Sequence, residues 1–508
     1  MAASKPVVSP LDEYNQTLIN NAHPPEWVNP KPLGRYNLVV VGGGTAGLVA
    51  AAGAAGLGAR VALIERHLLG GDCLVAGCIP SKALIRAARA AYEPTHSAEF
   101  GVHLPPSNPP RLEFGDAMQR MRRLRAQISF HDSAQRFTEL GVDVFIGQAT
   151  FVSRNAIEVE GTRLEFARAI LANGARAALL PVSGLEDAGY LTSESVFSLT
   201  RCPSSLIVIG AGPIGCELAQ AFRRFGAEVS VVSIDPQILP REDADAANLL
   251  QQQLEREGVR LFLGAHIRQA EKSSVGKTIV FERGQGVEHV TGDEILVAVG
   301  RTPNIEALNL EAAGVQYNAK GVSVDGRLRT TNPRIYAAGD ICSNYQFTHA
   351  AEALARIALQ NALFFGRKKA SDLIIPWCTY TDPEIAHVGP SSSEAQKRGP
   401  EVETITLQLG HNDRAIVDGE TDGFLRVHFN AEKGIILGAT LVSKHAGESV
   451  GELVLAIQKK MKIWELGSVI HPYPTQAEII KRLGDAALRT RLKPWMKKLL
   501  ERVLRLRR

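Results

Sequence analysis

The chain contains little cysteine, no basic and apolar leader at its start, and almost no excess of one charge. Six cysteines in 508 residues are too few for a disulfide framework, which predicts a reducing, cytoplasmic setting. The opening segment MAASKPVVSPLDEYNQ holds no apolar core behind a basic start, so no signal peptide is expected. The net charge is only +4, and residues 1–490 carry 49 Lys/Arg against 52 Asp/Glu, which argues against a nucleic-acid-binding protein.

Charged residues are also missing between Arg35 and Arg60, a span long enough to cross a bilayer. The span nevertheless begins with the strand-forming run Asn37–Val41 and continues into GGGTAG and an Ala/Gly-rich segment. A strand, a tight turn and a packed helix explain this composition better than a membrane span does. With 45% hydrophobic and 22% charged residues, the chain is predicted to be globular, with about three domains.

Two segments repeat the order strand, glycine turn, helix, strand, and predict two dinucleotide-binding domains of the α/β class. They are YNLVVVGGGTAGLVAAAGAAGLGARVALIER and SSLIVIGAGPIGCELAQAFRRFGAEVSVVSI. In each, the first glycine permits a tight turn, the second lets the backbone approach a pyrophosphate, and the third lets the helix pack on the strand. The glycines are Gly42, Gly44 and Gly47 in the first segment and Gly210, Gly212 and Gly215 in the second.

The residue that ends the second strand of each segment bears on the nucleotide that binds. Glu65 ends that strand in the first segment, where a carboxylate binds an adenosine ribose. Ser233 stands at the corresponding place in the second segment, so an argument for NADH is missing there. Arg223, Arg224 and Arg241 lie nearby in sequence as partners for a 2′-phosphate, which favours NADPH.

The remaining segments differ in composition. Residues 1–33 carry prolines and no periodicity, which predicts an arm on the surface. Residues 111–140 predict a charged helical stretch that ends near Gly141, and its basic run Met121–Arg125 is interpreted as a solvated face. From residue 371, short β-rich runs such as GFLRVHFN and GIILGATLVSK predict an antiparallel sheet followed by helices.

Two cysteines, Cys73 and Cys78, are separated by only four residues in GGDCLVAGCIPSK. A zinc site normally needs a second close pair of ligands, and the other cysteines are scattered singly, so no metal is expected. A structural disulfide closing so short a loop adds little stability and does not persist in a reducing compartment. Redox cycling of the pair is the interpretation that is left.

Five motifs together resemble the class I FAD-dependent pyridine nucleotide-disulfide oxidoreductases, in their mercuric-reductase-like branch. They are GGDCLVAGCIPSK, GAGPIGCELAQAF, ILVAVGRTPN, IYAAGDIC and YTDPEIAHVG, in this order, and the resemblance covers about residues 36–490. It implies two Rossmann-like domains, one for FAD and one for NADPH or NADH, and a C-terminal α+β interface domain that forms a homodimer. The predicted division is an arm at 1–33, the FAD-binding domain at 34–178 and 303–370, the NAD(P)-binding domain at 179–302, the interface domain at 371–490 and a basic tail at 491–508.

The resemblance also implies roles for individual residues. Cys78 is the charge-transfer thiol against the flavin, and Cys73 is the interchange thiol that faces the substrate. Lys82 and Glu217 form an ion pair beside the flavin and the nicotinamide, and Asp340 holds the ribityl chain. The residues expected to bind the two cofactors are Gly42, Gly44, Thr45, Ala46, Gly47, Glu65, Gly71, Asp72, Lys82, Gly174, Gly210, Gly212, Ile214, Gly215, Ser233, Gly300, Arg301, Asp340, Ala350 and Ala351.

One motif departs from the family pattern. The family usually has His-Pro-Thr-x-x-Glu near its C-terminus, with the histidine as the base for a thiol substrate and the glutamate orienting it. This chain has HPYPTQAE, so Tyr473 stands at the position of the base and Glu478 is retained. Tyrosine is a poor base at neutral pH, and His471 does not obviously replace it. The last cysteine is Cys378, so the C-terminal cysteine pair of mercuric reductases is missing as well.

The tail is a separate feature. Residues 491–508 carry eight Lys/Arg against one Glu, with Trp495, Leu499, Val503 and Leu506 at helical spacing. One interpretation is a solvated helix that packs a few apolar residues on the dimer. The other is an interfacial helix on anionic lipid.

The sequence therefore predicts an oxidoreductase that passes electrons from NAD(P)H through FAD to a Cys73–Cys78 disulfide, and on to a disulfide, a metal ion or another acceptor. Tyr473 and Glu478 are expected to come from the partner subunit. A dihydrolipoamide dehydrogenase with His471 as its base is the alternative within enzymes. A non-catalytic, nucleotide-sensing flavoprotein is the alternative of another class.

Overall fold

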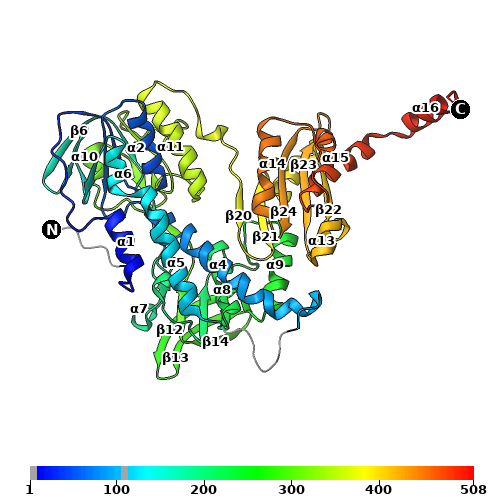
Figure 1. The fold of residues 1–508 in the computed structure, drawn as a ribbon, viewed down its shortest axis with the longest axis horizontal. Helices are drawn as coiled ribbons and strands as arrows, with labels where there is room; N and C mark the ends of the chain where they lie inside the picture. Colours follow the sequence, from blue (N-terminus) through cyan, green and yellow to red (C-terminus); the bar gives the residue numbers. More distant parts are fainter. Residues whose placement is uncertain (1–7, 104–111, 508) are drawn as a thin grey trace. The chain divides into compact units, whose positions relative to one another are not determined.

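The computed structural model describes residues 8–103 and 112–507. Residues 1–7 of the predicted arm, residue 111 of the predicted helical stretch and residue 508 of the tail lie outside the described residues. The chain divides into two compact units, which Figure 1 shows with their elements labelled. Unit 1 comprises Met1–Pro236 and Glu257–Leu373, and unit 2 comprises Gln237–Arg256 and Ile374–Arg508.

The first sheet of unit 1 has seven strands in the order β3-β2-β1-β6-β5-β4, with β19 also paired to β6. Strands β3, β2, β1, β6 and β19 run parallel, whereas β4 and β5 continue from β6 as an antiparallel meander. Its strands are β1 (Tyr36–Val41), β2 (Val61–Glu65), β3 (Val142–Ile146), β4 (Ala149–Ser153), β5 (Ala156–Val159), β6 (Thr162–Leu171) and β19 (Ile335–Ala337).

The second sheet of unit 1 is parallel and has the order β11-β10-β9-β15-β8. Unit 1 also contains an antiparallel sheet, β12-β13-β14, and two pairs of short strands, β16-β7 and β17-β18. The strands of these sheets are β7 (Ala175–Ala177), β8 (Leu191–Thr192), β9 (Ser205–Ile209), β10 (Glu228–Ser233), β11 (Arg260–Leu263), β12 (His266–Ser273), β13 (Gly276–Arg283), β14 (Gly286–Gly292), β15 (Glu294–Val297), β16 (Arg301–Pro303), β17 (Tyr317–Asn318) and β18 (Gly321–Val322).

The α-helices of unit 1 connect these strands and supply the site residues. They are α1 (Glu13–Ala22), α2 (Thr45–Gly56), α3 (Gly71–Val75), α4 (Cys78–Tyr92), α5 (Phe114–Ser129), α6 (Ala134–Glu139), α7 (Leu185–Ala188), α8 (Pro213–Arg224), α10 (Leu310–Ala313) and α11 (Thr348–Leu363). No helix within the described residues is long and apolar enough to cross a membrane.

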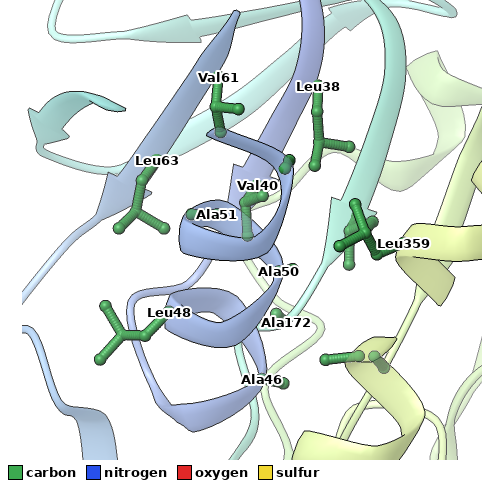
Figure 2. Packing of buried hydrophobic residues seen from close by; sticks show 14 of the residues in the cluster. Leu38, Val40, Ala46, Leu48, Ala50, Ala51, Val61, Leu63, Ala172 and Leu359 are labelled. Atoms are coloured by element: carbon green, nitrogen blue, oxygen red, sulfur yellow. The ribbon is translucent and has the colours of Figure 1, made fainter. Parts of the chain in front are cut away.

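Helix α2 packs directly on the first parallel sheet because its inner residues are small. Figure 2 shows Ala50 and Ala51 of α2 among Val40 of β1, Leu63 of β2 and Leu359 of α11, all buried. The turn before α2 requires glycine at two places. Gly42 has φ +105°, and a Cβ on Gly47 would lie 1.7 Å from the Gly42 carbonyl oxygen. The predicted strand, glycine turn and helix are therefore present.

Unit 2 is built on an antiparallel sheet in the order β20-β21-β24-β23-β22. Its strands are β20 (Trp377–Thr379), β21 (Glu384–Val388), β22 (Val402–Gln408), β23 (Phe424–Asn430) and β24 (Ile436–Ser443). Its α-helices are α9 (Ala244–Arg256), α12 (Ser392–Lys397), α13 (Asp413–Asp418), α14 (Ala446–Gln458), α15 (Glu478–Arg491) and α16 (Pro494–Arg505). The predicted fold class, two parallel α/β sheets and a C-terminal α+β part, is confirmed.

Two expectations about the N-terminal part are wrong. The segment predicted as an aperiodic surface arm contains α1, which the Asp12 side chain caps and which buries Leu18 and Ala22 in the core. The basic run on α5 is not a solvated face, because Arg122 and Arg125 are buried. Arg122 pairs with Asp12 at 2.5 Å. Arg125 donates to Asn15 on α1 at 2.6 Å, so these guanidinium groups hold the N-terminal helix in place.

Candidate active site

Two helices position the cysteine pair. Cys73 lies in α3, and Cys78 is the first residue of α4. The preceding residue, Gly77, makes no side-chain cap, so the N–H groups of the first turn of α4 point toward the Cys78 end. The two thiols lie near each other and interact, so that the ionisation of one depends on the other.

The environment of the pair separates the acidities of its two thiols. Interaction with the Cys73 thiol is the main cause that lowers the pKa of Cys78, and the Thr348 hydroxyl and the Lys82 charge lower it further. The same interaction, together with burial, raises the pKa of Cys73. The surroundings of the pair thus favour the thiolate on Cys78 and the proton on Cys73.

Thr348 is a site residue that the sequence did not reveal. It is the first residue of α11, and its Oγ1 atom lies 3.3 Å from the Cys78 sulfur, although 270 positions separate the two residues. Ala350 and Ala351, expected to bind the cofactors, are buried in the first turn of the same helix. The sequence signal that was available is that Thr348 lies only two residues before Ala350, so its hydroxyl is at the same end of the helix.

Replacing Thr348 with valine is expected to raise the pKa of Cys78 by about one unit, because the thiolate loses a hydrogen-bond donor. The lowered pKa means that the reactive thiolate is lost as the pH falls through about 6, and in the variant this loss begins at a higher pH. The measurement is the pH dependence of Cys78 alkylation by iodoacetamide in the reduced holoenzyme. Ser81→Ala is the control, since Ser81 donates to the Cys78 carbonyl oxygen. An unchanged midpoint in Thr348→Val would contradict the prediction.

The predicted ion pair is formed. The Lys82 Nζ atom on α4 lies 2.7 Å from the Glu217 carboxylate on α8, and the Glu217 side chain is only 6% exposed. Lys82 lies one turn from Cys78 on the same helix, so its charge acts on the thiolate. The pair thus joins the cysteine-bearing helix to the helix of the second glycine turn.

The first glycine turn has the features of a pyrophosphate site. Thr45 and Ala46 begin α2, and no side chain caps this helix at Gly44. A Cβ on Gly44 would meet only the Gly71 backbone, at 3.7 Å, so the turn is open at the second glycine. Glu65 accepts hydrogen bonds from the N–H groups of Gly43 at 2.6 Å and His67 at 2.7 Å, and burial raises its pKa. Open helix N–H groups and an oriented carboxylate fit an adenine dinucleotide.

A second charged group lies close to this turn. Arg301 contacts the carboxylates of Asp72 at 2.7 Å and Asp340 at 3.3 Å, and its own side chain is 12% exposed. Burial raises the pKa of both aspartates, and the guanidinium group opposes that rise. Arg301 thereby ties α3, which carries Cys73, to the segment after β19, which carries Asp340.

The second glycine turn repeats the first. Gly210 has φ +105°, and a Cβ on Gly215 would lie 2.0 Å from the Gly210 carbonyl oxygen. The backbone around Gly212 faces open space, which a Cβ would occupy, and Ile214 lies in the first turn of α8. Two more predicted glycines lie between strands, Gly174 with φ +62° and Gly300 with φ +126°, and both are also open. The residues of this turn fit a second dinucleotide.

The arginines that favoured NADPH are mostly engaged elsewhere. Arg224 is buried and pairs with Glu257 at 2.7 Å, with both side chains 2% exposed. Arg223 donates to the carbonyl oxygens of Glu257 and Ala227. Sequence proximity was misleading here because α8 turns these side chains toward its own unit. Arg241 is exposed, and it belongs to unit 2. Ser233 ends β10 as predicted and is buried.

The C-terminal residues of the predicted site lie in unit 2, and each has its own partner there. The Tyr473 hydroxyl donates to Asp413 at 2.9 Å, which raises the pKa of Tyr473. Glu478 pairs with Arg482 at 3.1 Å. Within this unit, therefore, the glutamate is held by an arginine and the tyrosine by an aspartate.

His471 is also engaged. Its Nε2 atom lies 3.0 Å from a Glu452 carboxylate oxygen, and its Nδ1 atom lies 3.3 Å from the Val469 carbonyl oxygen. The side chain is 7% exposed. With both ring nitrogens occupied, this histidine is poorly arranged to take a proton from a substrate.

Two family models match the chain. The model described as pyridine nucleotide-disulphide oxidoreductase matches residues 36–355, and the model of the dimerisation domain of the same family matches residues 375–483. Two curated relatives are a mercuric reductase of Bacillus cereus and a dihydrolipoyl dehydrogenase of Bacillus subtilis. The first is 32% identical over 447 residues, or 88% of this chain and 70% of the relative. The second is 31% identical over 448 residues, which are 87% of this chain and 96% of the relative.

Solved structures are similar over the same length. LpdA from Mycobacterium tuberculosis is 27% identical, with a TM-score of 0.81 over 89% of this chain and 99% of that protein. The HOCl-induced flavoprotein disulfide reductase RclA from Escherichia coli is also 27% identical, with a TM-score of 0.79 over the same shares of the two chains.

Proposed function

Because the chain belongs to the pyridine nucleotide-disulphide oxidoreductase family, whose members use FAD and NAD(P)H, we propose that Cys73 and Cys78 carry electrons from these cofactors to an external acceptor. The observation that carries the proposal is the placement of the pair: Cys73 lies in α3, and Cys78 opens α4, 3.3 Å from the Thr348 hydroxyl and one turn from Lys82. A dithiol with two such different acidities is suited to thiol exchange.

The glycine turns and their neighbours fit the two cofactors. Backbone N–H groups at the start of α2 would bind the pyrophosphate of FAD, Glu65 the adenosine ribose and Asp340 the ribityl chain. The turn before α8 would bind NAD(P)H. Bound there, FAD would supply two-electron transfer between NAD(P)H and the cysteine disulfide.

The different acidities of the two thiols support different roles for Cys78 and Cys73. Cys78 is stabilised as a thiolate by Thr348 and Lys82, as the thiol next to the flavin should be. Cys73 would attack the acceptor, and its proton would pass to the neighbouring Cys78 sulfur. For a disulfide acceptor the overall reaction is NAD(P)H + H⁺ + RSSR → NAD(P)⁺ + 2 RSH, so atoms and electrons balance.

The C-terminal segment bears on the class of acceptor. The raised pKa of Tyr473 makes its hydroxyl a weaker acid than that of free tyrosine and keeps it un-ionised at neutral pH, so a leaving thiolate gains no proton from it. We therefore favour acceptors that need no such base: a disulfide with acidic leaving thiols, or a soft metal ion held by the two thiolates. The dimerisation domain supports a homodimer, in which Tyr473 and Glu478 would complete the partner's site. A dithiol enzyme of this kind belongs in the cytoplasm, where thiols stay reduced.

Dihydrolipoamide dehydrogenase activity is the second candidate, because relatives with that name match the chain and His471 is held by a carboxylate. Both ring nitrogens of His471 already have partners, which argues against His471 as the base of such an enzyme. Negligible lipoamide turnover, or turnover that survives His471→Ala unchanged, would remove this candidate.

The proposal predicts the outcome of an anaerobic titration of the purified protein with NADPH and, separately, NADH. We expect a long-wavelength absorption band between the Cys78 thiolate and the flavin, absent in Cys78→Ser. The nucleotide that is effective at the lower concentration identifies the cofactor; we expect NADPH because Ser233 leaves the second turn without an acid. Bleaching of the flavin without the band would make the protein a plain diaphorase. Absence of reduction by either nucleotide would favour the non-catalytic, nucleotide-sensing flavoprotein.

A further inference from the structure

The C-terminal helix α16 (Pro494–Arg505) has one apolar and one charged face, and the catalytic proposal uses neither. No residue from Pro494 to Arg507 is buried. The helix lies beyond residue 483, where the match to the dimerisation domain ends. It follows α15 at the red end of the chain in Figure 1. The exposed apolar and charged side chains of α16 therefore have no role in the proposed electron transfer.

One half of the helix surface is apolar throughout. At about 100° per residue, the apolar side chains fall within one arc of about 180°. They are Trp495, Met496, Leu499, Leu500, Val503, Leu504 and, just past the helix end, Leu506. Trp495 is 62% exposed, Leu499 54% and Leu504 60%. A continuous exposed face of this kind is rare on a solvated helix and needs a covering surface.

The other half of the helix is basic. Its charged residues are Lys497, Lys498, Glu501, Arg502 and Arg505, four cations against one anion. Charges of alternating sign are typical of a helix face that is exposed to water. A face that is mainly cationic beside a broad apolar face, with a tryptophan at one end, instead matches a helix that lies in the plane of a membrane.

We infer that α16 lies in the interface of an anionic membrane, with Leu499 and Val503 among the acyl chains and Lys498 and Arg502 at the lipid headgroups. The partner is the lipid surface itself. A helix of this length extends about 18 Å and lies parallel to the surface, since it is too short and too charged to span a bilayer. The residues outside 491–508 carry 49 Lys/Arg and 52 Asp/Glu, so the positive charge that attracts lipid is concentrated in the tail.

The test is co-sedimentation of the full-length holoenzyme with vesicles of phosphatidylcholine alone and of phosphatidylcholine with phosphatidylglycerol at 3:1. We expect at least about tenfold tighter binding to the anionic vesicles, weakened by salt because the attraction is Coulombic. Binding should shift the fluorescence of Trp495 to shorter wavelength. That shift is read as the difference from Trp495→Phe, because the chain has four tryptophans.

Matched substitutions separate the two faces. Leu499→Glu with Val503→Glu should abolish binding, whereas Val417→Glu on α13, at a residue 70% exposed, should not change it. Lys498→Glu with Arg502→Glu should weaken binding to anionic vesicles at least about tenfold, and Lys433→Glu should have little effect. Flavin content and NAD(P)H oxidation should stay unchanged in all of these variants.

Three outcomes would overturn the inference. The first is no binding of the full-length protein to either vesicle, and the second is equal binding to neutral and anionic vesicles. The third is a change from dimer to monomer on deletion of residues 491–508, measured by light scattering, because the apolar face would then be covered by a second copy of the chain. Failure of the catalytic proposal would leave all three readouts unaffected.

Discussion

Replacement of Cys78 with serine is expected to lower NADPH-dependent reduction of 5,5′-dithiobis(2-nitrobenzoate) by at least about 10³-fold. A hydroxyl group cannot form the disulfide that carries electrons onward, and it is not ionised near pH 6 as the Cys78 thiol is. Reduction of ferricyanide by NADPH should persist, since electrons can leave from the flavin without the cysteine pair. The two assays, run on the same preparation, separate loss of the pair from loss of the fold.

Two further variants sharpen this experiment. Cys202→Ser is the matched control, because Cys202 lies outside the site and burial raises its pKa to about 11, which leaves it an unreactive thiol. Cys73→Ser removes the attacking thiol but retains a hydroxyl donor to Cys78, so the disulfide should go unreduced while the long-wavelength band persists. Full activity of Cys78→Ser toward the disulfide would show that another group carries the electrons.

Replacing Arg301 with glutamine is expected to reduce the free energy of unfolding by about 3 kcal/mol at pH 7.5 and to lower FAD retention. The change leaves Asp72 and Asp340 as partly buried carboxylates without their cation, close to the glycine turn proposed for the FAD phosphates. The measurements are urea unfolding and the ratio of bound flavin to protein. Arg329→Gln, which removes an exposed pair with Asp325, should cost less than about 1 kcal/mol.

The pH dependence distinguishes this mechanism from simple loss of packing. Burial raises the pKa of Asp72 and Asp340 in the folded protein, and removing Arg301 raises it further. A carboxyl group with a raised pKa destabilises the fold above that pKa and ceases to do so as it takes up a proton. The deficit of Arg301→Gln should therefore shrink from pH 7.5 to pH 5, and Asp72→Asn in the same chain should restore part of the stability. An equal deficit at both pH values would contradict the prediction.

The features that could be predicted from the sequence are those whose cause is local. The turn Gly42–Gly47 is recognisable because a steric demand of the backbone leaves only glycine at its ends, and the alanines that follow favour a helix. The start of α4 near Cys78 is local as well, because Pro80 fits the first turn of a helix and the alanine-rich residues after it favour helix. Where spacing along the chain also sets spacing in space, as for Cys73 and Cys78, the chemistry of a site can be inferred before the fold is known.

The tertiary structure decided which charged and polar groups meet. Arg122 and Arg125 look like a solvated face until α1 covers them, and Arg224 looks available for a phosphate until Glu257 takes it. Thr348 reaches Cys78 across 270 positions. The physical reason is that backbone conformation follows from steric preferences of a few adjacent residues, whereas the partner of a long side chain depends on elements that pack together from distant parts of the chain. The sequence by itself determined the two glycine turns, the close spacing of Cys73 and Cys78 and the amphipathic tail, and only packing decided the surroundings of Cys78 and the partners of its neighbours.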